Sequence, residues 1–137
     1  MKTNAVQRSL AHLRRAGYTC GVVERWNAFA RIRQDLFGFA DLACIRADYK
    51  GTLYVQCCPA STLAAHRQKV LSNPNVRTAL LAGNLVRIDA WGLYTPPGPG
   101  QRGKRKRWEV RQEYIELDML KENSDGDSNE AGDQDIF

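Results

Sequence analysis

The sequence has few of the features that mark membrane-spanning, secreted or zinc-binding proteins. No apolar run approaches the about 18 residues that a transmembrane helix needs, and the N-terminus leads into a basic amphipathic segment, not an apolar signal core. The four cysteines (Cys20, Cys44, Cys57, Cys58) lie in apolar stretches and, with only two histidines, form no zinc-ligand spacing. We therefore expect a cytoplasmic protein with reduced thiols, no membrane association and no zinc.

The composition is that of a globular domain with an uneven distribution of charge. Of 137 residues, 43% are hydrophobic and 26% are charged, which excludes collagen-like, coiled-coil and wholly disordered chains. Residues 1–115 hold 19 Lys and Arg against 7 Asp and Glu, whereas residues 116–137 hold 1 against 8. We expect one domain over residues 1–121, with a basic loop at 96–107, and a disordered acidic tail over residues 122–137. The basic body predicts a polyanionic partner, for which the tail would compete.

Hydrophobic periodicity predicts an α/β fold in which a mixed sheet is flanked by helices. The expected order is one helix, three strands, one or two helices and two strands. Helices are expected at 4–16, 61–71 and 73–82, and strands at 18–25, 38–45, 52–57, 85–91 and 108–117. Residues 26–37 are expected to form a loop or a short helical turn.

Three successive predicted strands each carry one polar side chain in an apolar background. Glu24 lies on the first of these strands, Asp41 on the second and Gln56 on the third. A buried carboxylate such as Asp41 is costly unless it is paired, hydrogen-bonded or bound to a metal ion. On neighbouring strands the three side chains could converge on one spot, where oxygen ligands suit Mg²⁺ or Mn²⁺.

Four short motifs occur in an order and spacing that resemble those of a nuclease superfamily. They read V-E-R-W at 23–26, D-L-F-G-F-A-D at 35–41, V-Q at 55–56 and H-R-Q-K at 66–69. With the predicted order of elements, the chain resembles the PD-(D/E)XK superfamily, most of all its Holliday-junction-resolvase-like and VRR-NUC-like branch and a group of small, often phage-borne proteins. The resemblance implies a restriction-endonuclease-like αβββαβ core.

The resemblance also implies roles for particular residues. Asp41 would be the metal-binding aspartate, Gln56 stands where the family usually has Glu, and the backbone carbonyl of Cys57 would be a further metal ligand. Cys58 stands at the position of the family's lysine, which orients and activates the attacking water and offsets charge on the phosphate. Because a thiol does neither, Lys69 on the following predicted helix is the candidate replacement.

The activity that the resemblance implies is hydrolysis of phosphodiester bonds by a water that Mg²⁺ or Mn²⁺ activates. The first 18 residues contain no Asp or Glu, so the acidic residue that resolvases carry on their first helix has no counterpart here. Glu24 or Asp35 would then have to supply the second negative charge at the metal. Both have structural alternatives, because Glu24 can pair with Arg25 or Arg31 at a surface and Asp35 can cap a turn.

Basic side chains gather in two further segments and on one predicted helix. Cations on a flexible loop suit phosphate contacts, which give affinity without sequence readout. The alternative is that these side chains, and Lys69 with them, form solvated faces. The candidate DNA-binding residues are Arg31, Arg33, Arg67, Arg102, Lys104, Arg105, Lys106 and Arg107.

Together these patterns predict a metal-dependent DNA endonuclease, or resolvase-like phosphodiester hydrolase, that acts on branched or structured DNA. A two-fold homodimer is a corollary, because a junction has paired strands to cut. One alternative is a catalytically degenerate nuclease fold that only binds nucleic acid, for which Cys58 is the best argument. Another is a protein-interaction adaptor or inhibitor that uses the acidic tail as its contact.

Overall fold

The computed structural model describes residues 4–96 and 105–120. Within them the α-helices are α1 (Ala5–Arg15), α2 (Leu63–Leu71) and α3 (Pro74–Leu81). One sheet consists of β1 (Thr19–Val22), β4 (Leu42–Ile45), β5 (Leu53–Pro59), β6 (Leu85–Tyr94) and β7 (Arg107–Tyr114). A separate hairpin consists of β2 (Arg25–Asn27) and β3 (Ile32–Gln34), and two short 3₁₀ turns are η1 (Ala60–Thr62) and η2 (Leu117–Met119).

The five-stranded sheet is mixed, with the strand order β1-β4-β5-β6-β7. Strands β5 and β6 run parallel, and every other neighbouring pair in this sheet is antiparallel. A parallel pair needs a crossover connection, which η1, α2 and α3 provide here. The expected α/β class with a mixed sheet flanked by helices is therefore confirmed.

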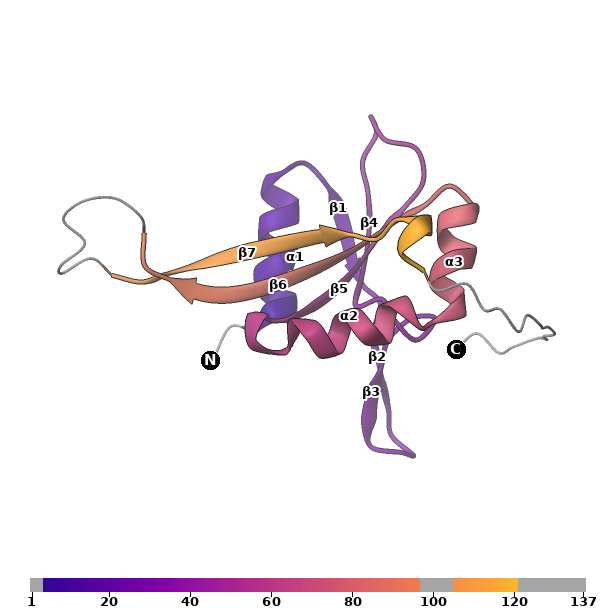
Figure 1. Cartoon of the computed structure of the whole chain (residues 1–137), viewed down its shortest axis with the longest axis horizontal. Coiled ribbons are helices and arrows are strands. Elements are labelled where there is room, and N and C mark those ends of the chain that lie inside the picture. The colour runs from indigo at the N-terminus through magenta and orange to yellow at the C-terminus, as the bar shows by residue number, and fades with distance from the viewer. Residues whose placement is uncertain (1–3, 97–104, 121–137) are drawn as a thin grey trace.

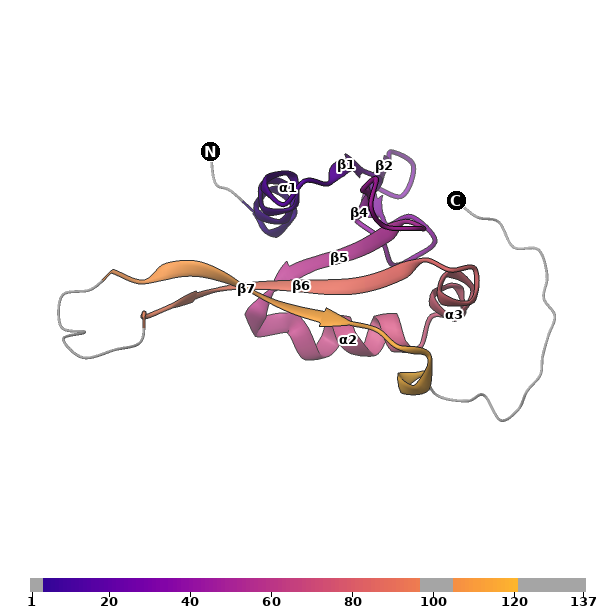
Figure 2. The same cartoon turned by 90° about the horizontal axis from the view of Figure 1, so that it is seen from above.

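Helices cover both faces of the sheet, with α1 on one face and α2 and α3 on the other (Figures 1 and 2). Strand β5 shows how the sequence determines this arrangement, because successive side chains of a strand point to opposite faces. Leu53, Val55 and Cys57 pack in the core under α1. Cys58 packs in the core under α2 and α3, and Gln56, which lies two residues earlier in the strand, faces that same side.

The ends of two helices follow from asparagine caps. The Asn4 side chain accepts a hydrogen bond from the backbone N–H of Gln7 at the start of α1, at 2.9 Å. The Asn73 side chain accepts one from the N–H of Asn75 at 2.8 Å, and Pro74 occupies the first turn of α3. Both helices begin within a residue or two of the positions that the sequence predicts, because these caps satisfy otherwise unpaired N–H groups.

The structure corrects the expectation for residues 26–37, which do not form a plain loop or helical turn. Residues 25–34 form the β2–β3 hairpin, in which Trp26 pairs with Arg33 and Asn27 with Ile32. The two short strands lack a clean apolar–polar alternation, so the periodicity did not predict them. The observed strands are also shorter than the predicted ones: β1 ends at Val22 and β4 begins at Leu42, so Glu24 and Asp41 lie just outside them.

Strands β6 and β7 form a long arm that extends beyond the helices (Figure 1). The loop that joins them contains residues 97–104, among them Arg102 and Lys104, which lie outside the described residues. The predicted acidic tail over residues 122–137 also lies outside them. In the part of the chain that is described, no helix is long and apolar enough to cross a membrane.

Candidate metal centre

Asp41 directly precedes β4 and lies between β5 and the residue that follows β1. Its backbone N–H donates to the carbonyl of Val55 at 2.9 Å, and its carbonyl accepts from the N–H of Val23 at 2.9 Å. The strand ladder therefore continues through Asp41, and its side chain is only 5% exposed. The carboxylate oxygen Oδ2 accepts a hydrogen bond from the backbone N–H of Cys57 at 2.8 Å, which aims the carboxyl group at β5.

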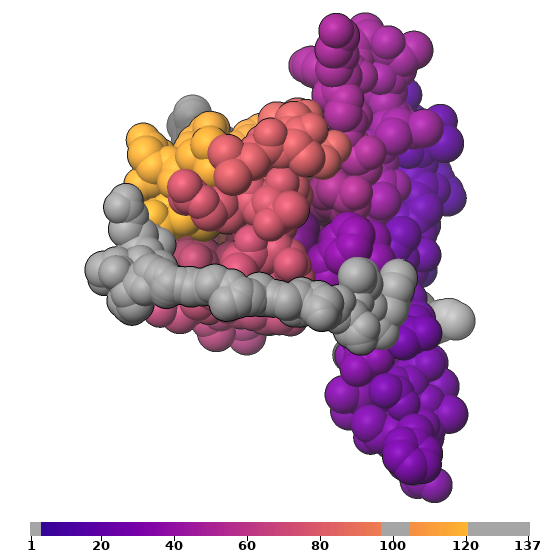
Figure 3. Space-filling model, turned by 90° about the vertical axis from the view of Figure 1, so that its right-hand side faces the viewer, coloured from indigo at the N-terminus to yellow at the C-terminus, as the bar shows by residue number. Residues whose placement is uncertain are grey.

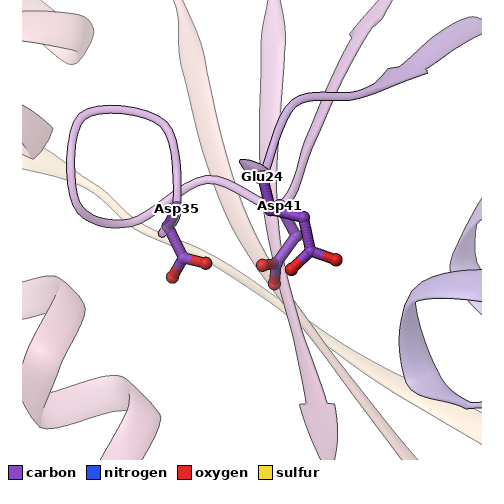
Figure 4. A group of neighbouring side chains, drawn as sticks. All are labelled: Glu24, Asp35 and Asp41. Atoms are coloured by element: carbon purple, nitrogen blue, oxygen red, sulfur yellow. The ribbon is translucent and has the colours of Figure 1, made fainter. Parts of the chain in front are cut away.

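Three carboxyl groups meet at this point, from Glu24, Asp35 and Asp41. One oxygen from each lies within 4.8 Å of the other two, and the side chains extend to the same side of the ribbon (Figure 4). Glu24 directly precedes the β2–β3 hairpin and Asp35 directly follows it, so the hairpin brings them together at its base. The predicted convergence of Glu24, Asp41 and Gln56 is confirmed, and the cluster could hold a metal ion.

Gln56 links two of the carboxylates through its side-chain amide. Its Nε2 lies 3.0 Å from Oδ2 of Asp41, 3.1 Å from Oδ2 of Asp35 and 2.8 Å from the carbonyl oxygen of Phe39. An amide nitrogen has two hydrogens, so these three acceptors exceed what it can donate. The opposite atom, Oε1, is buried and has no hydrogen-bond partner among the described residues. The Gln56 amide therefore faces more acceptors than it can satisfy and lacks a donor for its own oxygen.

Crowding of the carboxyl groups separates the pKa values of Asp41 and Asp35. Burial, the hydrogen bond with Asp35 and the negative charges of Asp35 and Glu24 raise the pKa of Asp41 to about 8. Burial also acts to raise the pKa of Asp35, but hydrogen bonds from Asp41, Lys69 and Gln56 outweigh it and hold that pKa below its ordinary value. At neutral pH Asp41 thus carries a proton that a bound cation would replace.

Lys69 brings a positive charge to the cluster from α2. Its Nζ lies 2.8 Å from Oδ2 of Asp35, and the side chain is 47% exposed. Cys58, at the position where the resemblance implies a lysine, is 1% exposed and packs in the core under α2. Burial raises the pKa of its thiol to about 11, so Cys58 is neutral at physiological pH. Lys69 therefore lies at the cluster and not on a solvated face away from it.

The structural alternatives for the other candidate residues have mixed outcomes. Asp35 does not act simply as a turn cap, because its side chain binds Lys69 and Gln56. Glu24 lies 3.8 Å from the guanidinium of Arg33, a longer contact at the base of the hairpin.

The carbonyl of Cys57 leaves β5 on the same side as its N–H, since both groups of one strand residue project to one edge. That edge is the one at which the Asp41 carboxylate lies.

The predicted DNA-binding arginines differ in how strongly acidic neighbours hold them. Arg67 makes two hydrogen bonds to the carboxylate of Glu113, at 2.9 and 2.6 Å, and Arg107 makes one to Glu109 at 3.1 Å. Arg31 lies at the tip of the β2–β3 hairpin and is exposed, as are Arg105 and Lys106 beside β7. Arg67 is thus occupied within the molecule, which the sequence pattern did not indicate.

A second buried polar cluster, on the α1 side of the sheet, escaped the sequence analysis. Asp89 is 0% exposed and accepts from Ser9 Oγ at 2.8 Å and from Arg87 Nε at 2.7 Å. Ser9 also accepts a hydrogen bond from the indole nitrogen of Trp91 at 2.8 Å. The signal was present, because Arg87 and Asp89 alternate with apolar residues in β6 and so share one face. The cluster joins α1 to the sheet.

Comparison with known proteins adds no relative to this picture. No protein-family model, no curated protein and no solved structure matches the chain.

Proposed function

We propose that the protein is a metal-dependent deoxyribonuclease with a restriction-endonuclease-like core that hydrolyses phosphodiester bonds in branched or structured DNA. The observation that carries the proposal is the cluster of Glu24, Asp35 and Asp41, with oxygens within 4.8 Å of one another. Lys69 adds a cation 2.8 Å from Asp35. Acidic oxygens beside a lysine are the residue types that metal-assisted phosphodiester hydrolysis requires.

The donor set fits a hard divalent cation such as Mg²⁺ or Mn²⁺. These ions prefer carboxylate and carbonyl oxygens and retain several waters. Asp41 and Asp35 would hold the ion, with Glu24 and the carbonyl of Cys57 beside them. The excess of acceptors around Gln56, and its unpartnered Oε1, support the same conclusion, because a cation would relieve both. When bound, the ion supplies an activated water and neutralises charge on the phosphate.

The residues of the chain would each contribute a distinct property to this reaction. Asp41 gives up its proton when the ion binds and then carries the negative charge that holds it. Gln56 fixes the orientation of Asp35 and Asp41 through its amide. Lys69, from the helix, lies where its ammonium can contact a phosphate oxygen at the cluster, the task that Cys58 cannot perform.

Cleavage of labelled DNA tests the proposal. A four-way junction, a flap, a single strand and a linear duplex are incubated with the protein and Mg²⁺ or Mn²⁺, beside an Asp41→Ala variant. We expect metal-dependent cutting of the branched substrates by the wild type and at least about 100-fold slower cutting by the variant. An absence of cutting, or equal cutting by the variant, would contradict the proposal.

The leading alternative is a degenerate nuclease fold that binds DNA without cutting it. The neutral Cys58 favours this reading, because β5 contributes no charged group where the superfamily has its lysine. The same experiment distinguishes the two, since salt-sensitive binding without cutting in wild type and variant alike supports the alternative. Homodimerisation remains part of the main proposal, and a solution mass of one chain with and without DNA would count against it.

A further inference from the structure

The β2–β3 hairpin projects from the body of the protein and exposes large apolar side chains. It forms the narrow extension that leaves the globular part in Figures 1 and 3. Phe29, at its tip, is 97% exposed, Trp26 is 56% exposed and Ile32 is 50% exposed. Three such side chains within one ten-residue segment are more than the scattered exposed apolar residues of an ordinary surface, and they mark an interaction site.

Local hydrogen bonds give the tip a defined conformation. The side-chain oxygen of Asn27 accepts from the backbone N–H groups of Phe29 and Ala30, both at 3.0 Å. The N–H of Arg31 donates to the carbonyl of Asn27 at 2.7 Å, and Arg31 adopts a positive φ of 59°. This turn presents the Phe29 ring outward at little further cost in conformational entropy on binding.

The charge of the hairpin selects the class of partner. Residues 25–34 include Arg25, Arg31 and Arg33 and contain no Asp or Glu. Arg33 is directly paired with Trp26, so a guanidinium and an indole lie on the same face of the hairpin. Aromatic rings beside arginines are typical of surfaces that stack on bases and contact phosphates. Self-association through this segment would bring like charges together, which disfavours a second copy as the occupant.

The hairpin also rises directly from the carboxylate cluster. Glu24 and Asp35 are the residues that flank it, and Glu24 lies 3.8 Å from Arg33. Phe29 lies five residues after Glu24, and strand geometry limits the distance between their Cα atoms to about 16 Å. With the reach of the two side chains added, a base in contact with Phe29 lies within about one helical turn of duplex, about 34 Å, of a phosphate at the cluster.

We propose that the β2–β3 hairpin is a wedge that recognises branched DNA. Phe29 stacks on an unpaired or unstacked base at the branch point, and the hairpin arginines contact the flanking phosphates. This inference rests on the DNA-binding part of the proposed function and assigns to one segment the preference for branched over linear DNA. Hydrolysis is not required for it.

Equilibrium binding of the full chain in EDTA tests the wedge without any cleavage. The probes are a forked DNA that carries 2-aminopurine at the branch and a linear duplex with the same label and length. For Phe29→Ala we expect the preference for fork over duplex to fall at least about fivefold, with quenching of the label at the branch lost. Phe29→Trp should retain both, whereas Leu81→Ala, which removes a 63% exposed side chain from α3, should change neither.

The outcomes separate the wedge from the nuclease proposal. An unchanged fork preference in Phe29→Ala overturns the wedge and leaves the nuclease proposal standing. A lost preference supports the wedge even if Mg²⁺ produces no cutting, a result that would count against hydrolysis only. A wild-type chain that binds neither DNA overturns both proposals. A dimer that Phe29→Ala dissociates, with no change in DNA affinity, overturns the wedge alone. Phe29 is 97% exposed, so its variants are expected to fold.

Discussion

Lys69 Nζ lies 2.8 Å from Oδ2 of Asp35, so a helix supplies the cation that the neighbouring strand lacks. Lys69 belongs to α2, whereas Cys58 on β5 is buried and neutral. The helix brings its side chain over the sheet because Leu63 and Val70 are its buried residues, which leaves Lys69 beside the edge of the core. The charge at the cluster thus depends on the packing of α2.

Replacing Lys69 should affect cleavage more than folding. We expect Lys69→Met to reduce the rate of metal-dependent cutting by about 100-fold or more, because a cation near the phosphate is lost. The free energy of unfolding should change by no more than about 1 kcal/mol, since the Lys69 side chain is 47% exposed. Single-turnover cleavage and urea denaturation measure the two effects. Arg77→Gln on α3 is the control, and a variant of Lys69 that cuts normally would contradict the role given to it.

The raised pKa of Asp41 predicts that stability falls with rising pH. Burial and two neighbouring carboxylates raise the pKa of Asp41 to about 8, so the folded chain retains a proton that the unfolded chain loses near pH 4. Between these values the free energy of unfolding should decrease by up to about 1.4 kcal/mol per pH unit and level off above pH 8.

Urea denaturation from pH 5 to pH 9 in EDTA measures this slope. Asp41→Asn should flatten it, because the amide can still accept the N–H of Cys57 and donate to Asp35 without titrating. The variant should therefore be more stable than the wild type at pH 8. A free energy of unfolding that stays constant or rises from pH 5 to pH 8 in the wild type would contradict the raised pKa of Asp41.

Binding of a divalent cation should release a proton from the cluster. At pH 7 Asp41 is mostly protonated, and an ion at the cluster must replace that proton. We expect close to one proton released per Mn²⁺ bound at pH 7, and affinity that increases up to about tenfold per pH unit below pH 8. Isothermal titration calorimetry in two buffers of different ionisation enthalpy counts the protons. With Asp41→Asn the release should vanish, and its persistence would point to another site.

Arg67 should become a DNA contact only when its carboxylate partner is removed. The two short hydrogen bonds to Glu113 occupy its guanidinium, so Arg67→Gln should change DNA affinity little. Glu113→Gln should raise affinity and steepen the slope of log affinity against log salt by about 0.9, the value for one added phosphate contact. Binding to a duplex at several salt concentrations gives both slopes. Weaker DNA binding by Glu113→Gln would refute this assignment.

The buried cluster under α1 should contribute strongly to stability. Ser9→Ala removes both the donor to Asp89 and the acceptor for Trp91, at a cost of about 1–3 kcal/mol. Asp89→Asn leaves the buried Arg87 without its counter-charge and should cost about 3–5 kcal/mol. The exposed Ser61→Ala serves as the control for chemical denaturation, with an expected change within about 0.5 kcal/mol. Small effects at Ser9 and Asp89 would show that water replaces these contacts.

The sequence determined the features that depend on local chain properties. Apolar periodicity predicted α1, α2, α3 and the strands of the main sheet, and the predicted helices begin and end close to the observed ones. A carboxylate in an apolar background, Asp41, marked the site because its burial needs a partner. These signals lie within a few residues of one another along the chain and need no knowledge of the packing.

The tertiary structure decided which side chains meet. The hairpin between Glu24 and Asp35 has no clear alternation, and its form comes from the Asn27 turn and from pairing across it. The partners Lys69–Asp35 and Arg67–Glu113 are 34 and 46 residues apart, so no local pattern distinguishes them from solvated charges. Contacts between distant residues depend on how helices and sheet pack together, and only the folded chain fixes those distances.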